Sequence, residues 1–242
     1  MNLLERWWSE RAAFAVLESM ALWSLVTIAL YLLAKRFHRR LTRWWSAPII
    51  VAPFFLIVIT VASHTSYSVY INGTHWLIAA LGPATVAFAV PIHRQRAVIR
   101  RHWLVLAAGV LIGSGTAMLS AWWLAGMLGL EGSMRLSLLP RSISTPFAMT
   151  VSGEIGGVPD LTAVFVMVTG VFGAAFGATI LYWLPLRSAL ARGALFGMGA
   201  HAVGSNRAHQ IDPDEGAIAG LVMVLAGIFN VLAAPLLAHF LR

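Results

Sequence analysis

The chain of 242 residues contains no cysteine and few charged residues. The absence of cysteine excludes disulfides, thiolate metal sites and a cysteine nucleophile, and it leaves the compartment open. Charged residues make up 11% of the chain, whereas hydrophobic residues make up 59%. A water-soluble domain carries about 25% charged residues, so this composition indicates an integral membrane protein.

The signatures of common enzyme classes are also missing. The sequence has no G-x-S-x-G, Walker A or H-E-x-x-H motif, and its acidic residues are scattered. We therefore expect no enzyme activity, no catalytic residue, no metal site and no cofactor. The net charge of +8 does not indicate nucleic-acid binding, because the basic residues lie between hydrophobic segments, where the positive-inside bias places them.

Hydrophobic segments long enough to cross a bilayer recur along the whole chain. A spanning helix needs about 20 residues. We predict an all-α polytopic membrane protein, with one integral membrane domain over residues 1–242 and about six full transmembrane helices. These helices are expected at 12–34, 48–63, 76–90, 103–130, 161–184 and 216–241.

Two basic clusters set the expected orientation. The first lies between Lys35 and Arg43, and the second between Arg94 and Arg101. The stretch 63–75 between these clusters has no lysine, arginine or acidic residue. We expect a protein of the bacterial inner (cytoplasmic) membrane, with both basic clusters in the cytoplasm and the N-terminus outside.

Two short segments, 138–149 and 193–205, interrupt the pattern of long helices. Both are rich in glycine, proline or serine, and irregular backbone at membrane depth is tolerated only where protein or water covers it. We interpret them as broken or re-entrant segments that line a cavity. If both are re-entrant, Arg187 and Arg192 lie in the cytoplasm. If both cross fully, these arginines lie outside, which the positive-inside bias disfavours.

A weak internal repeat relates the two short segments. At an offset of 57, TGVFGA from Thr169 matches AGIFNV from Ala226, and residues 142–144 fall on residues 199–201. Two such units separated by one crossing have inverted topology, which is the architecture of many secondary transporters. Chance similarity between glycine-rich apolar helices is the alternative explanation.

Arg141 is the first candidate functional residue. A charge near the bilayer centre costs about 2.5–3.5 kcal/mol even on lenient insertion scales. Following Pro140 at the start of a half-helix, Arg141 offers a bidentate partner for a carboxylate, and the helix N-terminus adds partial positive charge. The alternatives are that Arg141 snorkels to the interface or pairs with Glu154 as a structural clamp.

Hydroxyl residues beside Arg141 and a histidine in the second short segment complete the predicted pocket. Serine and threonine can bind a hydroxyl or keto oxygen, although in membrane helices they more often bond to backbone. His201 can carry a proton near neutral pH or simply pack in the core. Arg207 and Glu215 are predicted to form an ion-paired gate. The substrate-binding candidates are Arg141, Ser142, Ser144, Thr145, His201, Ser205 and Thr85, and the predicted structural breaks are Pro83, Pro91, Pro140, Pro146 and Gly204.

Five motifs in order resemble the LrgB/CidB family. They are LGPATVAFAVPI from Leu81, LLPRSISTPFAM from Leu138, IGGVPDLTAVFV from Ile155, GMGAHAVGSNRA from Gly197 and DEGAIAG from Asp214. The resemblance covers about residues 70–242. The family usually has lysine at the position of Arg141, which keeps the charge but changes the geometry of anion contact. It usually has threonine where this chain has Met198 and Ser205, and alanine where it has Asn206.

The resemblance implies one of two functions. Because the family includes the C-terminal half of the plastid glycolate/glycerate translocator, the first is a secondary transporter, or a transporter subunit, for small monocarboxylates such as glycolate, glycerate, pyruvate or lactate. The second is a holin- or antiholin-like modulator of murein hydrolase export and autolysis. The charge and broken backbone in the interior favour transport. The resemblance also implies a small membrane partner of the LrgA/CidA type. The coupling ion, proton or sodium, and a homo-oligomeric state stay open.

Overall fold

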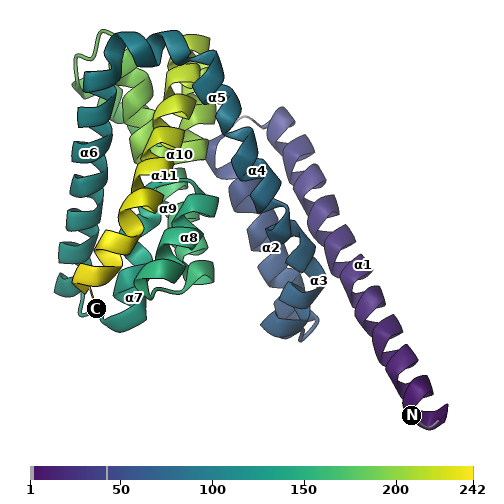
Figure 1. Ribbon diagram of the computed structural model, residues 1–242. Coiled ribbons are helices and arrows are strands. Elements are labelled where there is room, and N and C mark those ends of the chain that lie inside the picture. The colour runs from purple at the N-terminus through teal and green to yellow at the C-terminus, as the bar shows by residue number, and fades with distance from the viewer. Residues whose placement is uncertain (1–2, 42, 242) are drawn as a thin grey trace. The chain divides into compact units, whose positions relative to one another are not determined.

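The computed structural model describes residues 3–41 and 43–241. All regular structure in these residues is helical, so the predicted all-α membrane fold is confirmed (Figure 1). Five segments of the described chain are long and apolar enough to cross a membrane, and a shorter apolar helix joins them, which agrees with the predicted number of crossings. The chain packs as two compact units, Met1–Gly82 and Pro83–Arg242, which are described separately. The five segments are Glu18–Arg40, Tyr67–Arg94, Arg96–Met127, Pro159–Trp183 and Pro213–Phe240, and the shorter helix is Pro48–Ala62.

In the first unit, a long helix packs against two shorter ones. Gly73 allows the close approach of the long helix, because a Cβ at this position would lie 3.0 Å from the carbonyl oxygen of Ser19. Trp76 Nε1 donates to Ser24 Oγ (2.7 Å), and Ser24 Oγ donates to the Gly73 carbonyl (2.9 Å). These bonds satisfy polar groups inside the apolar environment. The elements of the unit are α1 (Leu3–Arg40), η1 (Trp44–Ser46), α2 (Pro48–Ala62) and α3 (Tyr67–Ala79).

The second unit carries both of the short segments that the sequence singles out. Its main core lies between η2, α8, α9 and α11, where Ala148, Val151 and Ile155 are completely buried. Its elements are most of α4 (Leu81–Ala87), then α5 (Ala89–Arg94), α6 (Arg96–Met127), α7 (Gly132–Leu138), η2 (Leu139–Ser142), α8 (Thr145–Ile155), α9 (Pro159–Trp183), α10 (Ala189–Ile211) and α11 (Pro213–Leu241).

The first short segment is re-entrant, and we call residues 137–158 the first hairpin. Its two ends meet, since the Val158 N–H donates to Ser137 Oγ (2.8 Å). Thr162 Oγ1 lies 3.0 Å from the Ser137 carbonyl oxygen and joins α9 to the same point. Between these ends the chain leaves along η2 and returns along α8. The segment therefore enters and leaves at one end of the unit.

Proline and glycine set the limits of the helices in the first hairpin. Pro140 has non-helical dihedrals (φ −83°, ψ 15°) inside η2, and the following Ile143 is extended. Pro146 lies in the first turn of α8. Backbone N–H groups in a first turn have no acceptor within the helix, so the N–H that proline lacks is not needed there. α8 ends at Ile155, and the following Gly156 has a φ of 92°, the left-handed conformation that commonly terminates a helix. Pro140 and Pro146 thus frame the turn, as the sequence predicts.

The second short segment is also re-entrant, and we call α10 the second hairpin. The helix reverses at His201 (φ 39°, ψ −123°). A Cβ on Gly204 would overlap the Phe196 carbonyl oxygen, although a continuous helix would separate positions 196 and 204 by about 12 Å. Gly193 and His209, near the two ends of α10, both lie against the start of α11. Gly204 therefore belongs to the break, because only a residue without a Cβ permits this contact.

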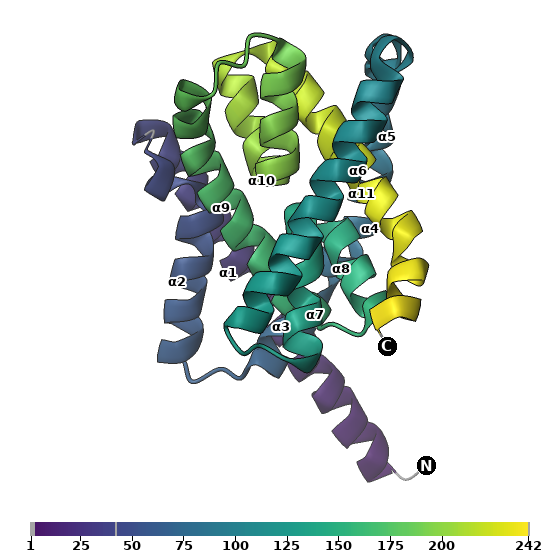
Figure 2. The same ribbon diagram turned by 90° about the vertical axis from the view of Figure 1, so that its left-hand side faces the viewer.

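The two hairpins enter from opposite ends of α6. At the base of the first, Arg135 donates to the carbonyl oxygen of Trp122, near the end of α6 (3.0 Å). At the base of the second, Leu190 packs in one cluster with Ile99, near the start of α6. Figures 1 and 2 show α7 and α8 at one end of this unit and α10 at the other. This geometry is the re-entrant alternative and not the fully crossing one.

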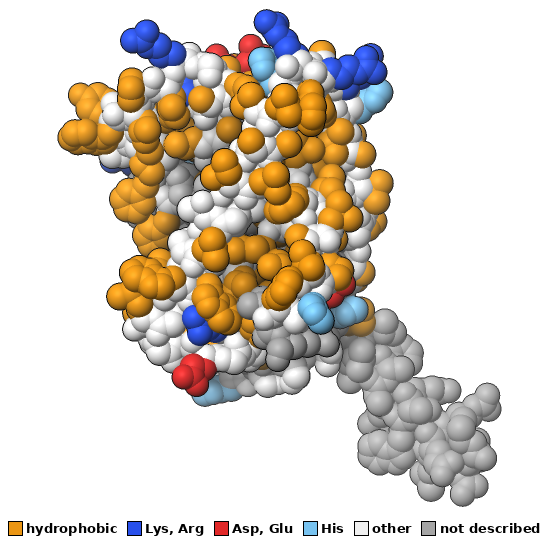
Figure 3. All heavy atoms as spheres, turned by 60° about the vertical axis from the view of Figure 1, so that its left-hand side comes forward, with side chains coloured by type: hydrophobic (Ala, Val, Ile, Leu, Met, Phe, Trp, Pro, Cys, Tyr) orange, Lys and Arg blue, Asp and Glu red, His pale blue; other side chains and the backbone are white. Residues whose placement is uncertain are grey.

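The surface of the molecule has the distribution expected of a membrane protein. In Figure 3 hydrophobic side chains spread across the middle of the face in view, and lysine and arginine gather mainly at one end. Exposed large apolar side chains include Leu104, Ile112 and Leu232 on α6 and α11. Such side chains are stable facing lipid tails.

Candidate functional site

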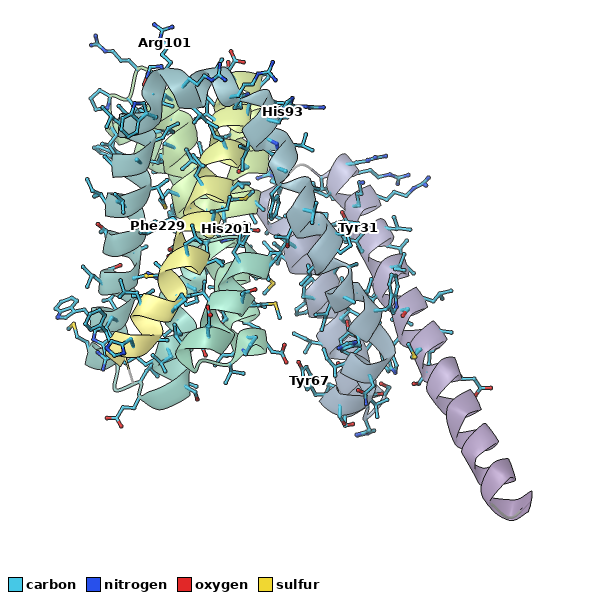
Figure 4. The ribbon with its side chains drawn as sticks, in the orientation of Figure 1. Tyr31, Tyr67, His93, Arg101, His201 and Phe229 are labelled. Atoms are coloured by element: carbon cyan, nitrogen blue, oxygen red, sulfur yellow. The ribbon has the colours of Figure 1, made fainter. Side chains whose placement is uncertain are left out.

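The helices that follow the two hairpins, α9 and α11, each carry a glycine at a close contact with a hairpin. α9 follows the first hairpin and packs against the second, and α11 follows the second and packs against the first. On α9, a Cβ at Gly170 would lie 2.5 Å from His201 Cε1 of the second hairpin. On α11, a Cβ at Gly227 would overlap the ring of Phe147 in the first hairpin. Gly170 and Gly227 are 57 positions apart, which is the offset of the internal repeat. The repeat therefore relates two glycines that make equivalent contacts, each with the turn region of the opposite hairpin. Figure 4 shows His201 at mid-height in the second unit.

A small cavity lies where η2 of the first hairpin meets α6, α10 and α11. It has room for a group of about the size of one water molecule. Its polar members are Ser114, Ser142 and Asn230, of which only Ser142 was a candidate from the sequence. The apolar lining residues are Ala117, Met118, Leu139, Pro140, Ile143 and Met198.

Arg141 lies between two residues that line this cavity, Pro140 and Ser142. It is half-buried, and its Nη1 atom is fully buried without a hydrogen-bond partner among the described residues. In this part of the chain no carboxylate pairs with it, and Glu154, its alternative structural partner, is exposed. A buried donor without an acceptor is costly, and more so when it carries charge. The guanidinium is therefore suited to bind an anion.

The predicted hydroxyl residues differ in their surroundings. Ser144 precedes α8 and is 4% exposed, and its side chain forms no cap bond. Thr145 begins α8 and is half-buried. Ser205 donates to the carbonyl oxygen of His201 (2.9 Å), which is the backbone bond expected of serine in a membrane helix. The structure thus brings Ser142, Ser144 and Thr145 to the turn that carries Arg141.

His201 forms the turn of the second hairpin and is 3% exposed. Its Nε2 atom is buried and has no hydrogen-bond partner in the described part of the chain. A neutral imidazole nitrogen of this kind can accept a proton or a hydrogen bond. Both the proton-carrier role and the packing role remain open predictions.

The predicted ion pair between Arg207 and Glu215 is not formed. Glu215 Oε1 lies 3.0 Å from Arg192 Nε, whereas Arg207 donates to Gln210 Oε1 (3.2 Å). The reason is the reversal of the chain at His201. It places the part of α10 before His201, which contains Arg192, beside the start of α11, which contains Glu215. The ion pair therefore joins the first arm of the second hairpin to α11.

Two of the predicted breaks, Pro83 and Pro91, lie outside the two hairpins, in a segment whose Phe88 ring packs against Phe147 of the first hairpin. Pro83 and Thr85 are in α4 and Pro91 is in α5, and the two helices are separated at Phe88. None of these residues lines the cavity, and the role of Thr85 in substrate binding stays a prediction. In the described residues no group of His, Asp or Glu side chains has the arrangement of a metal site.

Ser114 and Asn230 are site residues that the sequence analysis did not identify. Asn230 Nδ2 donates to Ser114 Oγ (2.9 Å) and to the Ala226 carbonyl oxygen (2.7 Å). Asn230 is 2% exposed in α11, one of the long apolar segments. The sequence could have indicated Asn230, because it is an amide in an otherwise apolar segment and polar residues inside the membrane commonly mark functional sites.

Comparison with known proteins places these features in a family. A model of the LrgB-like family matches residues 27–240, a range that begins well before the motifs in the sequence. The chain is 35% identical over 216 residues to the uncharacterized protein YwbG of Bacillus subtilis, covering 89% of this chain and 96% of that protein. It is 28% identical over 213 residues to the holin-like protein CidB of Staphylococcus aureus, covering 88% and 93%. No solved structure matches.

Proposed function

The chain belongs to the LrgB-like family, and we propose that it is a secondary transporter, or the transporter subunit of a two-component system, for small monocarboxylates of the glycolate, glycerate, pyruvate or lactate class. The observation that carries this proposal is the buried Nη1 atom of Arg141, which has no hydrogen-bond partner among the residues that the structure describes. A guanidinium binds a carboxylate through two parallel N–H bonds. In a low-dielectric interior such a pair is strong, and an unpaired charge is unfavourable.

The opposed hairpins support transport as well. They enter from opposite ends of α6 and meet near a cavity lined by residues of both, including Ser142 and Met198. In secondary transporters, broken elements of inverted repeats hold the substrate near the midplane, and movement of one element against the other exposes the site to each side in turn. Arg141 in the first hairpin then binds the carboxylate, and His201 in the second is the candidate proton carrier.

A holin-like function is the second candidate, and the name of the CidB relative favours it over transport. In this case the chain modulates murein hydrolase export and autolysis in the bacterial inner membrane. A holin-like pore needs amphipathic helix surfaces but no internal anion site. The two candidates therefore differ in a measurable property, because a pore passes many solutes with selectivity set mainly by size, whereas a carrier saturates and exchanges.

The test is counterflow in proteoliposomes, with and without a small LrgA/CidA-type partner. We expect saturable exchange of a labelled small hydroxy- or keto-acid and no release of an encapsulated neutral dye. Arg141→Ala should reduce exchange by about a hundredfold, because loss of a buried charged hydrogen-bonding group costs several kcal/mol. Arg141→Lys should retain part of it, since the charge remains. Arg101→Ala is the matched control, because Arg101 is exposed at the other end of the unit from the first hairpin (Figure 4).

Two results contradict the proposal. Wild-type exchange by folded Arg141→Ala protein eliminates the anion role of this residue. Dye release without saturable exchange supports the holin-like function instead, provided that size-exclusion chromatography shows the protein to be folded.

A further inference from the structure

An apolar groove lies in the second unit between α6, the part of α10 before His201, and α11. Its volume is about 270 Å³, close to the lower limit of small-molecule sites at about 300 Å³. Of the described residues that line it, only Ser188 has a polar side chain. The groove is therefore suited to a hydrocarbon chain and not to a polar substrate. The lining residues are Val105, Leu106, Gly109, Val110, Ser188, Leu190, Ala191, Ala194, Met198 and Val222.

The groove borders the lipid-facing surface of α6. Val105, which lines it, is 60% exposed, and the neighbouring Leu104 is exposed as well. A Cβ on Gly109 would meet nothing within 4 Å, so the missing side chain leaves space at this position. An empty groove would leave its lining atoms without van der Waals contacts on one side. Because lipid tails surround an apolar helix surface in a bilayer, an acyl chain is the occupant within reach.

Two stretches of the chain bring arginine to one end of the groove. Arg187 is exposed and comes directly before Ser188, which lines the groove and caps the start of α10. Arg100 is exposed near the start of α6, just before the helix bends at His102 and reaches the groove. Figure 4 shows the next residue, Arg101, at this end of the second unit. The groove therefore has an apolar body and a basic end.

Packing and charge make this end suited to an anionic group. Ile99 and Leu190 belong to one apolar cluster, so the starts of α6 and α10 are neighbours. Acidic residues also lie at this end, at the start of α11. Of these, Glu215 is paired with Arg192, and Asp212 accepts from the backbone at the start of the helix. Among the described residues, the exposed arginines of the two stretches form no ion pair, which leaves them available to an anion.

We propose that the groove binds one acyl chain of an anionic phospholipid, and that Arg100 and Arg187 hold the phosphate of this lipid. Basic pockets between transmembrane helices bind such headgroups, and a guanidinium matches two phosphate oxygens. Gly109 lies nine residues beyond Arg100, at most about 14 Å along a helix. This distance fits within one leaflet of the hydrocarbon core, about 15 Å. The lipid site is independent of the transport function, since a pore could bind lipid in the same way.

Native mass spectrometry of the full chain, purified in detergent, tests the headgroup contact. The probes are phosphatidylglycerol and phosphatidylcholine with the same acyl chains, added at equal concentration. We expect the wild type to retain phosphatidylglycerol about tenfold better. Arg100→Gln combined with Arg187→Gln should reduce this preference to about twofold. Arg100→Lys combined with Arg187→Lys is the matched control, which keeps the charge and should keep most of the preference.

A second pair of variants tests the position of the acyl chain. Gly109→Leu adds a side chain where the groove has open space, and it should lower the retention of phosphatidylglycerol about tenfold. Gly115→Leu is the matched control on α6, because a Cβ there also meets nothing within 4 Å and Gly115 lies outside the groove lining. Size-exclusion chromatography shows which variants are folded.

Three results overturn the inference. Equal retention of the two lipids by the wild type removes the role of the arginines. Equal retention of phosphatidylglycerol by Gly109→Leu and Gly115→Leu shows that the lipid binds elsewhere on the protein. If the wild type retains neither lipid, the groove does not hold one and is left to a partner helix. If Gly109→Leu does not fold, the arginine variants decide, because the side chains that they change are exposed.

Discussion

The two hairpins reverse the chain by different means. The first uses several residues, with Pro140 and Pro146 on either side of the extended Ile143. The second turns at one residue, His201, in a left-handed conformation. A wide turn lets several residues, Pro140, Ser142 and Ile143 among them, line the cavity. A single-residue turn presents one ring. Under the proposed transport function, the comparison favours substrate recognition by the first hairpin.

The bases of the hairpins differ as well. The first is closed by a buried polar network, in which Thr162 Oγ1 lies 2.7 Å from Ser152 Oγ and 3.0 Å from the Ser137 carbonyl. The second is closed by glycine packing, with Gly193 against the Glu215 carbonyl, and by the Arg192–Glu215 ion pair. Glycine packs against backbone at both bases, since a Cβ at Gly157 would lie 3.0 Å from the Ser137 nitrogen, so the bases differ in their polar contacts: hydrogen bonds in the first and an ion pair in the second.

The largest expected effect concerns the direction of the hairpins. Because the chain has no cysteine, single cysteines report on one position each. Glu131→Cys, just before the first hairpin, and Arg187→Cys, just before the second, should be labelled by an impermeant maleimide from opposite faces of the membrane. Arg187→Cys should share its face with Arg96→Cys, which we expect to be cytoplasmic. Labelling of Glu131→Cys and Arg187→Cys from the same face would show that the first of the two short segments crosses completely.

Added volume at the second turn should have the next largest effect. Gly204→Ala places a Cβ on the Phe196 carbonyl, and because backbone cannot move aside easily, we expect a loss of about 1–3 kcal/mol in the free energy of unfolding. Gly199→Ala, in the same helix, meets nothing within 4 Å and should gain up to about 1 kcal/mol from helix propensity. Unfolding by SDS in mixed micelles measures both. Equal values would mean that α10 does not reverse as described.

The sequence predicts much of this fold because composition and helix breakers act locally. The long apolar segments appear where hydropathy predicts them, and Pro140, Pro146 and Gly204 lie at the turns. Arg141 is recognisable because a charge in an apolar segment is costly wherever it lies. These features require no knowledge of which helices are neighbours.

The missed features depend on contacts between distant parts of the chain. Asn230 reaches Ser114 across 116 positions, and no spacing in the sequence indicates that pair. Glu215 is nearer in sequence to Arg207 but pairs with Arg192, because the turn at His201 returns the chain. The repeat at offset 57 relates Gly170 and Gly227, yet only the structure shows that each packs against the opposite hairpin.

The smallest expected effect tests whether hydrogen bonds hold the first hairpin. Thr162→Val keeps the shape of the side chain but removes the hydroxyl, which leaves Ser152 and the Ser137 carbonyl without this neighbour in a buried site. We expect a loss of about 1–2 kcal/mol in the free energy of unfolding. Thr150→Val is the matched control, because Thr150 is exposed and bonds only to the Pro146 carbonyl of its own helix, so its loss should be within about 0.5 kcal/mol. Unfolding in mixed micelles again provides the measurement. If the two threonine variants unfold alike, the polar network contributes nothing measurable, and the hairpins differ only in their turns.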